Sequence, residues 1–418
     1  NRALPVNTAA LNTAVGSLSM FSNTTGTENT AIGQASLYTN STGNYNTAVG
    51  RYALRLNSTG GENVAVGFES LEKCTGDYNT ALGAYAMEEN TSGAANVAIG
   101  HRALDANTTA SYNIAIGKHS LTSNTTGAGN VAVGRRALYT ATTASYNVAI
   151  GYNALYTANS EGNVAIGLEA LQVATGANNT AVGYQALAAD TTGANNTALG
   201  YHALNRTTTG SYNVGVGYEA LKDNTTAGTN TAIGYRASKS NTTGNYNVAV
   251  GYHALEENTT GVRNCAVGNN ALDDNTTGQD NTAVGYGALS ANTTASNNTA
   301  VGSNCLAGNT TGDNCVAVGH DVMEASNGDS NTGVGFEAMK TLSTGDNNTA
   351  VGRQCLNSIT TGRKNTALGT SGQAVTTGEN NSFLGYNAGS ASSPSGNITT
   401  QSNYVVLGDD NIANLMCA

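Results

Sequence analysis

Tyrosine is the residue type in this sequence whose spacing most clearly suggests binding chemistry. One set of tyrosines directly precedes an asparagine that opens a repeated pentapeptide: Tyr45, Tyr78, Tyr112, Tyr146, Tyr212 and Tyr246. A second set directly follows the glycine that closes it: Tyr152, Tyr184, Tyr201, Tyr218, Tyr235 and Tyr252. A tyrosine ring can pack against a sugar or against the ring of a neighbouring repeat. The second set is therefore our candidate for glycan contact, although packing between repeats is the favoured interpretation.

Other residues that could do chemistry show no arrangement typical of a catalytic or metal site. The five histidines lie one or two positions after a glycine, in separate repeats: His101, His119, His202, His253 and His320. We expect them at the surface. Acidic pairs such as Glu256-Glu257 and Asp273-Asp274 fall in variable turns, where a solvated rim explains them. Gly215-Val216-Gly217 is a copy of the repeat and not a nucleotide loop. We predict no catalytic residue, no metal and no cofactor.

The six cysteines follow neither a disulfide nor a zinc pattern. Cys265 occupies a Thr/Val position of the repeat, while Cys305 and Cys355 replace a small alanine. Cys315 either creates a bulge or takes the place of the opening asparagine. We expect buried thiols in place of small residues. Cys74 lies in a shortened turn and Cys417 near the end, and the sequence leaves their environment open.

The pentapeptide that organises these residues is Asn46-Thr47-Ala48-Val49-Gly50, which recurs about 23 times at a period of roughly 17 residues between Asn12 and Asn381. Its alternation predicts a short β-strand. We expect Thr47 and Val49 to face a thin core. We expect Ala48 and Gly50 to face a space too tight for larger side chains, such as a neighbouring layer or chain.

The remainder of each repeat contains an Ala-Leu pair and a polar turn. Ala53-Leu54 supplies the largest apolar residue, and we expect the leucines to form the central core ladder. The segment is either a second short strand or a single helical turn, and the strand is favoured. The turn ends in Ser58-Thr59-Gly60, or in Asn-Thr-Thr-Gly elsewhere, which is typical turn chemistry.

Composition favours one elongated all-β body over several globular domains. The 418 residues include 52 Gly, 2 Pro, no Trp and only 11% charged residues, too few large apolar residues for a globular core. The net charge of −10 disfavours nucleic acid as a partner. The sequence contains no apolar run long enough to span a bilayer. It begins inside a repeat, so we expect it to be a piece of a longer protein.

We therefore predict a parallel β-solenoid shaft over residues 1–388, a loop over 389–402 and a terminal strand or junction segment over 403–418. In-register turns would rise about 4.8 Å each and span roughly 110 Å. The opening asparagines would form a hydrogen-bonded ladder. On this prediction Asn247→Ala destabilises the fold more than Asn57→Ala, because Asn57 lies in a turn.

The strand Val97-Ala98-Ile99-Gly100 resembles the head repeats of trimeric autotransporter adhesins. The longer form, with Tyr-x-Ala-Leu and Asn-Thr-Thr-Gly, is similar to repeats of bacteriophage and viral tail fibres. The closing Asn403–Gly408 and Asn411–Leu415 segments resemble the region before an intramolecular chaperone domain. The resemblance implies a left-handed β-roll that assembles as a homotrimer, with the Ala and Gly columns placed around the three-fold axis.

These observations predict an extracellular or virion-surface fibre that attaches to a host glycan or receptor, with no membrane insertion. Two alternatives stay open: a tailspike-type enzyme that degrades polysaccharide, and a subunit of a self-assembling extracellular filament. A uniform repeat favours the fibre, because an active site normally interrupts the pattern.

Overall fold

The computed structural model describes residues 3–4, 8–391, 393 and 395–409. These residues form an all-β parallel solenoid without a helix, as predicted. The chain divides into two compact units, Asn1–Ser211 and Tyr212–Ala418, which share the same turn structure. The Asn411–Leu415 segment and Cys417 lie outside the described residues.

The main sheet of the first unit has one three-residue strand per turn among the described residues. Its strands are β1 (Thr13–Val15), β2 (Thr30–Ile32), β3 (Thr47–Val49), β4 (Val64–Val66), β5 (Thr80–Leu82), β6 (Val97–Ile99), β7 (Ile114–Ile116), β8 (Val131–Val133), β9 (Val148–Ile150), β11 (Val164–Ile166), β13 (Thr180–Val182) and β14 (Thr197–Leu199).

The second unit repeats this arrangement in its described residues. Its strands are β15 (Val214–Val216), β16 (Thr231–Ile233), β17 (Val248–Val250), β18 (Cys265–Val267), β19 (Thr282–Val284), β20 (Thr299–Val301), β21 (Val316–Val318), β22 (Thr332–Val334), β23 (Thr349–Val351), β24 (Thr366–Leu368), β25 (Ser382–Leu384) and β26 (Val405–Leu407).

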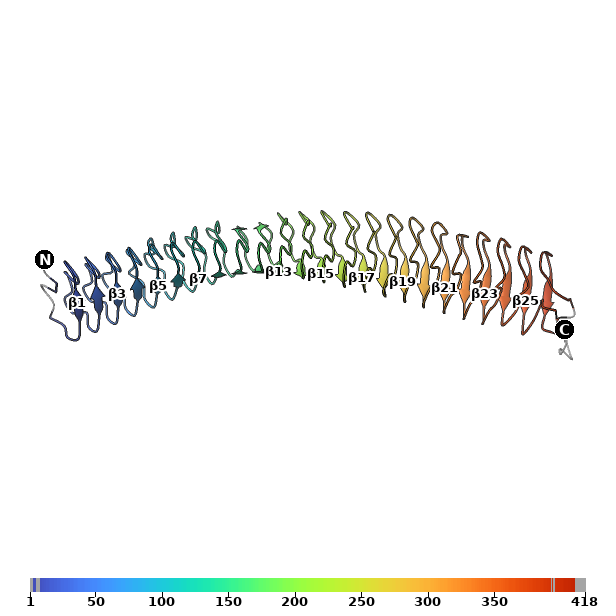
Figure 1. Ribbon diagram of the computed structural model, residues 1–418, viewed down its shortest axis with the longest axis horizontal. Coiled ribbons are helices and arrows are strands. Elements are labelled where there is room, and N and C mark those ends of the chain that lie inside the picture. Colours follow the sequence, from blue (N-terminus) through green and yellow to red (C-terminus); the bar gives the residue numbers. More distant parts are fainter. Residues whose placement is uncertain (1–2, 5–7, 392, 394, 410–418) are drawn as a thin grey trace. The chain divides into compact units, whose positions relative to one another are not determined.

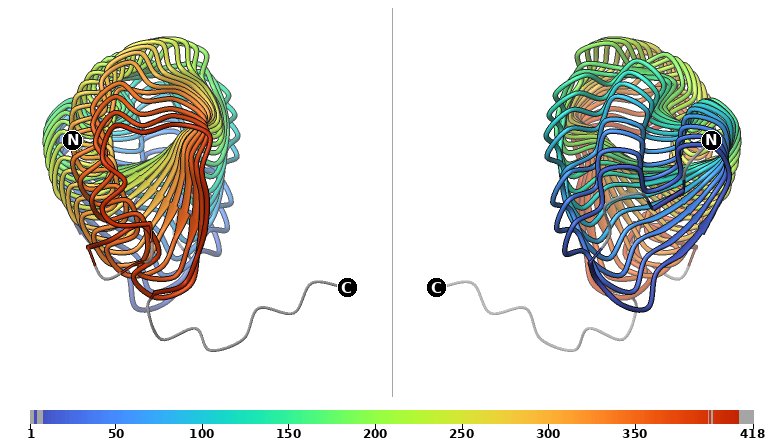
Figure 2. Two further views of the ribbon diagram at one scale, coloured as in Figure 1. Left: turned by 90° about the vertical axis from the view of Figure 1, so that its right-hand side faces the viewer. Right: turned by 90° about the vertical axis from the view of Figure 1, so that its left-hand side faces the viewer.

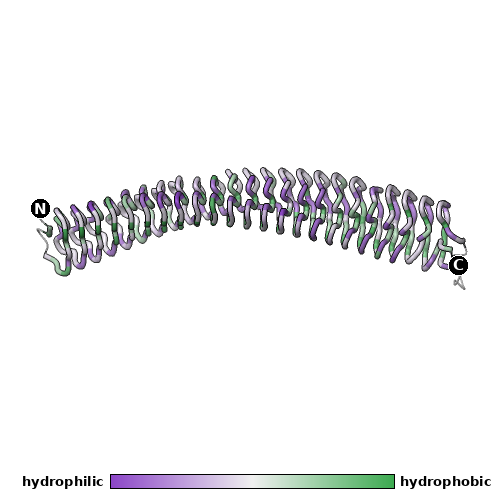
Figure 3. Tube along the Cα trace, in the orientation of Figure 1, coloured by the Kyte–Doolittle hydropathy of each residue, from purple (hydrophilic) through white to green (hydrophobic). Residues whose placement is uncertain are grey.

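Within each unit, every strand pairs in parallel with the strand of the next turn (Figure 1). The register is fixed by the repeat, since Thr47 pairs with Val64 and Ala48 with Ala65. Seen along the stack, the turns of each unit lie behind one another as flattened loops (Figure 2). Apolar and polar segments therefore recur once per turn along each unit (Figure 3).

The predicted second strand is wrong for most turns. Only β10 (Thr157–Ala158) and β12 (Val173–Ala174) form a second paired sheet among the described residues. Elsewhere the segment is a compact turn, because the residues at the Tyr52 and Leu54 positions have positive φ values of 65° and 49°. Such a conformation interrupts an extended strand. Leu54 still donates its backbone N–H to Ser70 O of the next turn (3.0 Å).

The predicted faces of the strand are inverted in the structure. Ala48, Ala65 and the equivalent alanines after the first strand are buried, whereas Thr47 and Val49 are partly exposed. The neighbours of Gly333, which takes the alanine position, explain the inversion. A Cβ at Gly333 would meet the side chains of Val322, Met323 and Met339, which come from the opposite wall. The alanine column thus faces the interior of its own chain, where the large side chains from the opposite side of the turn pack against it.

The glycine column packs against the next turn of the same chain, which confirms the neighbouring-layer interpretation. Gly50 has φ +138°, and a Cβ there would collide with the carbonyl oxygen of Gly67. The same collision would occur between Gly234 and Gly251. Glycine is therefore required at this position by both conformation and space.

The predicted leucine ladder is confirmed, and exceptions to it are compensated locally. Leu54, Leu104 and their equivalents are fully buried. At β25, Phe383 replaces the small alanine and is 2% exposed. Glycines 372 and 389 lie beside its ring, where an added Cβ would contact Phe383 in both cases. Two missing side chains therefore make room for one large ring.

The predicted asparagine ladder is confirmed. The backbone N–H of Asn247 donates to Asn230 Oδ1 (2.8 Å), and Asn264 N–H donates to Asn247 Oδ1 (2.9 Å). The expectation that Asn57 is an ordinary turn residue is wrong. Asn57 is fully buried in a second ladder, where its Nδ2 donates to Asn40 Oδ1 (3.2 Å) and to Gly60 O (2.9 Å).

The cysteines mostly behave as small buried residues. Cys74, Cys305, Cys315 and Cys355 are buried free thiols. Cys315 takes the place of the opening asparagine, because its backbone N–H donates to Asn298 Oδ1 (2.8 Å). Burial raises the pKa of the Cys74 and Cys315 thiols to about 11. The exception is Cys265, which is partly exposed because its column faces outward.

The segment after residue 388 returns to the solenoid pattern. Ile398 donates its N–H to Gly389 O within the insertion (3.1 Å), and Thr376 of the preceding turn donates to Thr399 O (2.9 Å), so Thr399 already stacks on the preceding turn. Strand β26 then pairs with β25, with Val406 opposite Phe383. The 389–402 insertion therefore lengthens one turn, and residues 403–409 continue the sheet.

Candidate functional site

The outward side of the sheet exposes an apolar surface in each unit. We call the second and fourth pentapeptide side chains of each main-sheet strand the outer face. The second position is mostly Thr or Val and the fourth is Val, Ile or Leu. Leucines at the fourth position are about half exposed, with Leu82 at 47%, Leu199 at 47% and Leu368 at 51%, and most of the valines and isoleucines there are partly exposed. The interior is already filled by alanine and leucine, so this apolar surface is additional to the core.

The tyrosines that follow the strand glycine form stacks. Tyr184 and Tyr201 stack with ring centroids 5.2 Å apart in the first unit. In the second unit Tyr218, Tyr235 and Tyr252 stack at 5.2 and 5.3 Å with nearly parallel planes. Tyr152 instead lies beside the Arg135 guanidinium, at 5.6 Å. These rings pack on the next turn, so their edges and hydroxyl groups face solvent more than their faces do.

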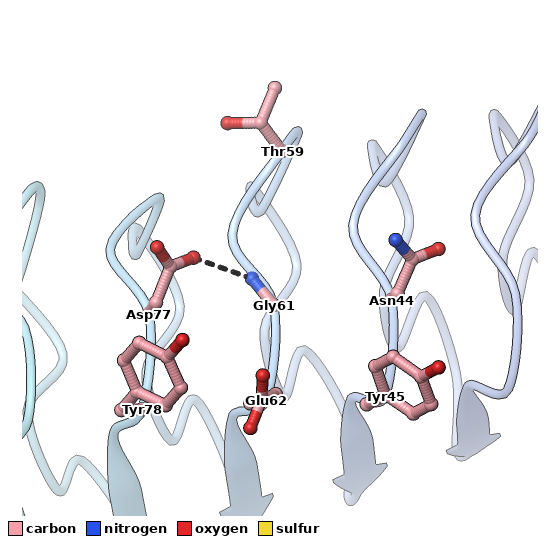
Figure 4. Close-up of a pocket in the computed structure, with 7 residues that line it drawn as sticks. All are labelled: Asn44, Tyr45, Thr59, Gly61, Glu62, Asp77 and Tyr78. Carbon is pink, nitrogen blue, oxygen red and sulfur yellow. Dashed lines mark hydrogen bonds between the residues drawn. The ribbon is translucent and has the colours of Figure 1, made fainter.

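A pocket of about 260 Å³ lies among the other tyrosine set. Its lining residues are Asn44, Tyr45, Thr59, Gly61, Glu62, Asp77 and Tyr78. Figure 4 shows Tyr45 and Tyr78 broadside on, along one line of the surface, with Glu62 between them. The two tyrosines are 55% and 59% exposed. The sequence contained the signal for this pocket, because Tyr45 and Tyr78 precede asparagines two turns apart.

Hydrogen bonds fix the backbone beneath these rings. The Gly61 N–H donates to Asp77 Oδ1 (2.8 Å), and the Tyr78 N–H donates back to Gly61 O (3.1 Å). In the same way, the Thr27 N–H donates to Asn44 Oδ1 (2.8 Å), and the Tyr45 N–H donates to Thr27 O (3.1 Å). The polar residue before each tyrosine therefore ties it to the preceding turn.

One group of side chains in the second unit has the geometry to hold a cation. The ligand atoms of His253, Glu256 and Asp273 lie within 4.8 Å of one another. His253 Nδ1 lies 2.6 Å from Glu256 Oε2. Burial, followed by the charges of Glu256, Asp274 and Glu257, raises the pKa of Asp273 to about 6. Arg236 lies 3.5 Å from Glu256 and would compete with a metal ion.

Carboxylates also meet in the first unit, where Glu69, Glu72 and Glu88 bring oxygens within 4.8 Å. Glu72 forms a 2.9 Å ion pair with Arg55. Burial, followed by the charge of Asp105, raises the pKa of Glu88. Neither group was predicted from the sequence, because their members come from successive turns, so that residues 16 or 17 positions apart become neighbours.

No protein-family model matches the chain, and no curated protein matches it. Among the residues that the structure describes, no helix has the length and apolar character needed to cross a lipid bilayer. The features of the chain that bear on function are therefore the outer face and the two tyrosine sets.

Proposed function

We propose that this chain is the structural and adhesive shaft of a homotrimeric extracellular fibre, of the kind found in viral and bacteriophage tail fibres or cell-surface appendages. The observation that carries the proposal is the outer face. A soluble single chain has little reason to present apolar side chains on every strand when its interior is complete.

The outer face has a size suited to association. Two partly exposed side chains per turn, over twelve turns, give on the order of 1,000 Å² per unit, against about 800 Å² per partner in a standard interface. Its repeat also favours identical partners, since parallel copies in register would place valine and isoleucine opposite valine and isoleucine.

A face that is two side chains wide suits a three-fold arrangement. Three copies that turn this face towards a common axis can fill the centre with one or two side chains from each chain. This assignment moves the predicted contact from the Ala and Gly columns, which are occupied within the chain, to the Thr/Val and Val/Ile/Leu columns. We retain the left-handed coil and the extracellular or virion-surface location as part of the same proposal.

We assign the attachment role to the surfaces that lie outside the outer face. The two tyrosine sets lie at the two ends of the strand, outside the outer face as defined, and the polar turns lie further from it. Repetition of one weak contact along such a surface gives strong overall binding. We expect the fibre to bind a host-surface glycan or receptor in this way.

The outer face can be tested with charged substitutions on consecutive turns. The triple variant Ile99→Asp, Ile116→Asp and Val133→Asp places three carboxylates in the proposed interface. Sedimentation velocity should show its mass falling from three chains towards one, because carboxylates would be buried without partners.

The matched control is Thr109→Asp, Thr126→Asp and Thr143→Asp, which adds the same charge to exposed turn residues of the same three turns. This control should retain the mass of the unmodified chain. Equal masses for the two triple variants and the unmodified chain would contradict the outer face as the interface.

A further inference from the structure

The tyrosines that precede the strand asparagine form a regular series on the first unit. We call Tyr45, Tyr78, Tyr112 and Tyr146 the tyrosine row. They are separated by 33 or 34 residues, which is two turns. At about 4.8 Å per turn, successive row tyrosines lie about 10 Å apart. These four residues are 55%, 59%, 73% and 70% exposed, which places them among the most accessible large residues of the unit.

The turns between them carry no aromatic side chain at the equivalent position. The intervening positions hold Glu62, Ala95 and Gly129. At Gly129, an added Cβ would lie 2.9 Å from Cδ1 of Tyr146, so that ring lies over the backbone of the preceding turn. Tyr45 and Tyr78 are likewise seen broadside on in Figure 4. None of the stacked ring pairs found in the described part of the chain includes a row tyrosine.

The backbone of the row suits tyrosine poorly, so the residue is present for its side chain. The four tyrosines have φ between 57° and 63°, a region in which a bulky residue is uncommon. Equivalent turns use asparagine, as at Asn178 and Asn195, which tolerates this conformation better.

The row is also held in place before any ligand arrives. Ser111 and Ser145 repeat the bonds of Asn44 and Asp77, since their hydroxyl oxygens accept from Ala94 N–H (3.0 Å) and Ala128 N–H (3.1 Å). Tyr112 and Tyr146 donate their N–H groups to Ala94 O (3.1 Å) and Ala128 O (3.0 Å). A surface fixed in this way loses little entropy on binding.

We infer that the tyrosine row binds an extended, uncharged, β-1,4-linked polysaccharide that runs along the unit. Two turns of the solenoid match the length of a disaccharide in such a chain, so every second sugar would meet a tyrosine face. The apolar face of a sugar ring packs on an aromatic ring, and polar groups beside it accept hydroxyl protons. Glu62 and Asp77 provide carboxylates in the pocket between Tyr45 and Tyr78, and their charge disfavours sulfated or uronic chains.

This inference deepens the proposed attachment function, on which it rests, by naming the ligand class. The test uses the full chain and measures its depletion from solution by microcrystalline cellulose, chitin and insoluble mannan, with starch granules as an α-linked comparison. Binding to at least one β-1,4-linked polymer, and not to starch, is expected. Absence of binding to all three β-1,4-linked polymers would overturn the inference.

The double variant Tyr78→Asn and Tyr112→Asn should weaken binding by roughly tenfold, because each ring contributes a modest packing energy. Asparagine fits the backbone at these positions, so the fold should persist, and thermal unfolding checks this. The control Tyr286→Asn removes a tyrosine that is 60% exposed but lies outside the row, and it should bind as the unmodified chain does. Unchanged binding of the double variant would also overturn the inference.

The mass of the particle separates this inference from the proposed function. A trimer that binds no polysaccharide would refute the tyrosine row and leave the fibre intact. A monomer that binds cellulose through Tyr78 and Tyr112 would refute the trimeric fibre and leave the row intact.

Discussion

At the scale of single residues, Asp190 occupies a position that other turns give to asparagine. It is fully buried, and its Oδ1 accepts a hydrogen bond from Gly193 N–H (2.9 Å). Burial raises the pKa of Asp190 to about 7, although the Gly193 bond acts in the opposite direction. The structure therefore favours the neutral carboxyl, which most resembles the asparagine amide that it replaces.

Asp190 should make stability depend on pH. Its folded pKa is above the unfolded value of about 3.9, so its contribution is complete below pH 4 and is lost as the pH rises towards 7. Asp190→Asn should remove this decline and raise the free energy of unfolding above pH 7 by roughly 1–3 kcal/mol. Unfolding measured from pH 4 to 8 tests this. Glu161→Gln, at an exposed turn position, serves as control, and equal pH profiles for the two variants would refute the prediction.

The two asparagine ladders predict a similar loss of stability on substitution of Asn57 and Asn247, although the sequence placed only Asn247 in a ladder. Asn247 and Asn57 are both buried, and the side chain of each bonds to a neighbouring turn: Asn247 Oδ1 accepts from Asn264 N–H, and Asn57 Nδ2 donates to Asn40 Oδ1. Asn57→Ala and Asn247→Ala should each lower the free energy of unfolding by about 1–3 kcal/mol, because each leaves buried polar groups unpaired. Thr59→Ala, at an exposed turn position, should change little. If Asn57→Ala resembled Thr59→Ala in thermal unfolding, the second ladder would not be a stabilising element.

At the scale of the strand, the existence and register of the main-sheet strand were predictable, but its faces were not. A period of two separates the residues into two sets without saying which set is inside. We assigned Thr47 and Val49 to the core because they are the larger residues. The interior at that point is narrow because Leu54 and its equivalents enter it from the opposite wall, and only alanine fits.

The conformation of the second half of the turn could not be predicted either, because residue type did not indicate it. Residues such as Tyr52 and Leu54 rarely adopt positive φ, so their types gave no indication of a turn. The stacked tyrosines were predictable as columns, because their spacing equals the period. The His253, Glu256 and Asp273 group was not recognised, since neighbours in adjacent turns are distant in sequence.

The inverted faces predict opposite responses to substitution within β17. Ala249→Leu should destabilise the fold by about 1–3 kcal/mol, because the buried column has no space for a larger side chain. Val248→Thr on the outer face should leave unfolding of the chain nearly unchanged, since Thr231 and Thr282 occupy this column in nearby turns. Thermal unfolding of both variants provides the comparison. A larger loss from Val248→Thr would restore the original assignment of the faces.

At the scale of the whole molecule, the account makes the apolar outer face the surface through which identical chains associate. Each unit has a complete interior of alanine, leucine and asparagine, and each also presents valine, isoleucine and leucine outward. In the proposed fibre, these exposed side chains are the surface that is buried between chains. The turns and the tyrosine row then remain available for attachment.

The most direct test of the trimeric fibre is the mass of the unmodified chain in solution, measured by native mass spectrometry across a range of concentrations. The account predicts a particle with three times the 42.1 kDa mass of the chain. A particle of one chain at every concentration would contradict it.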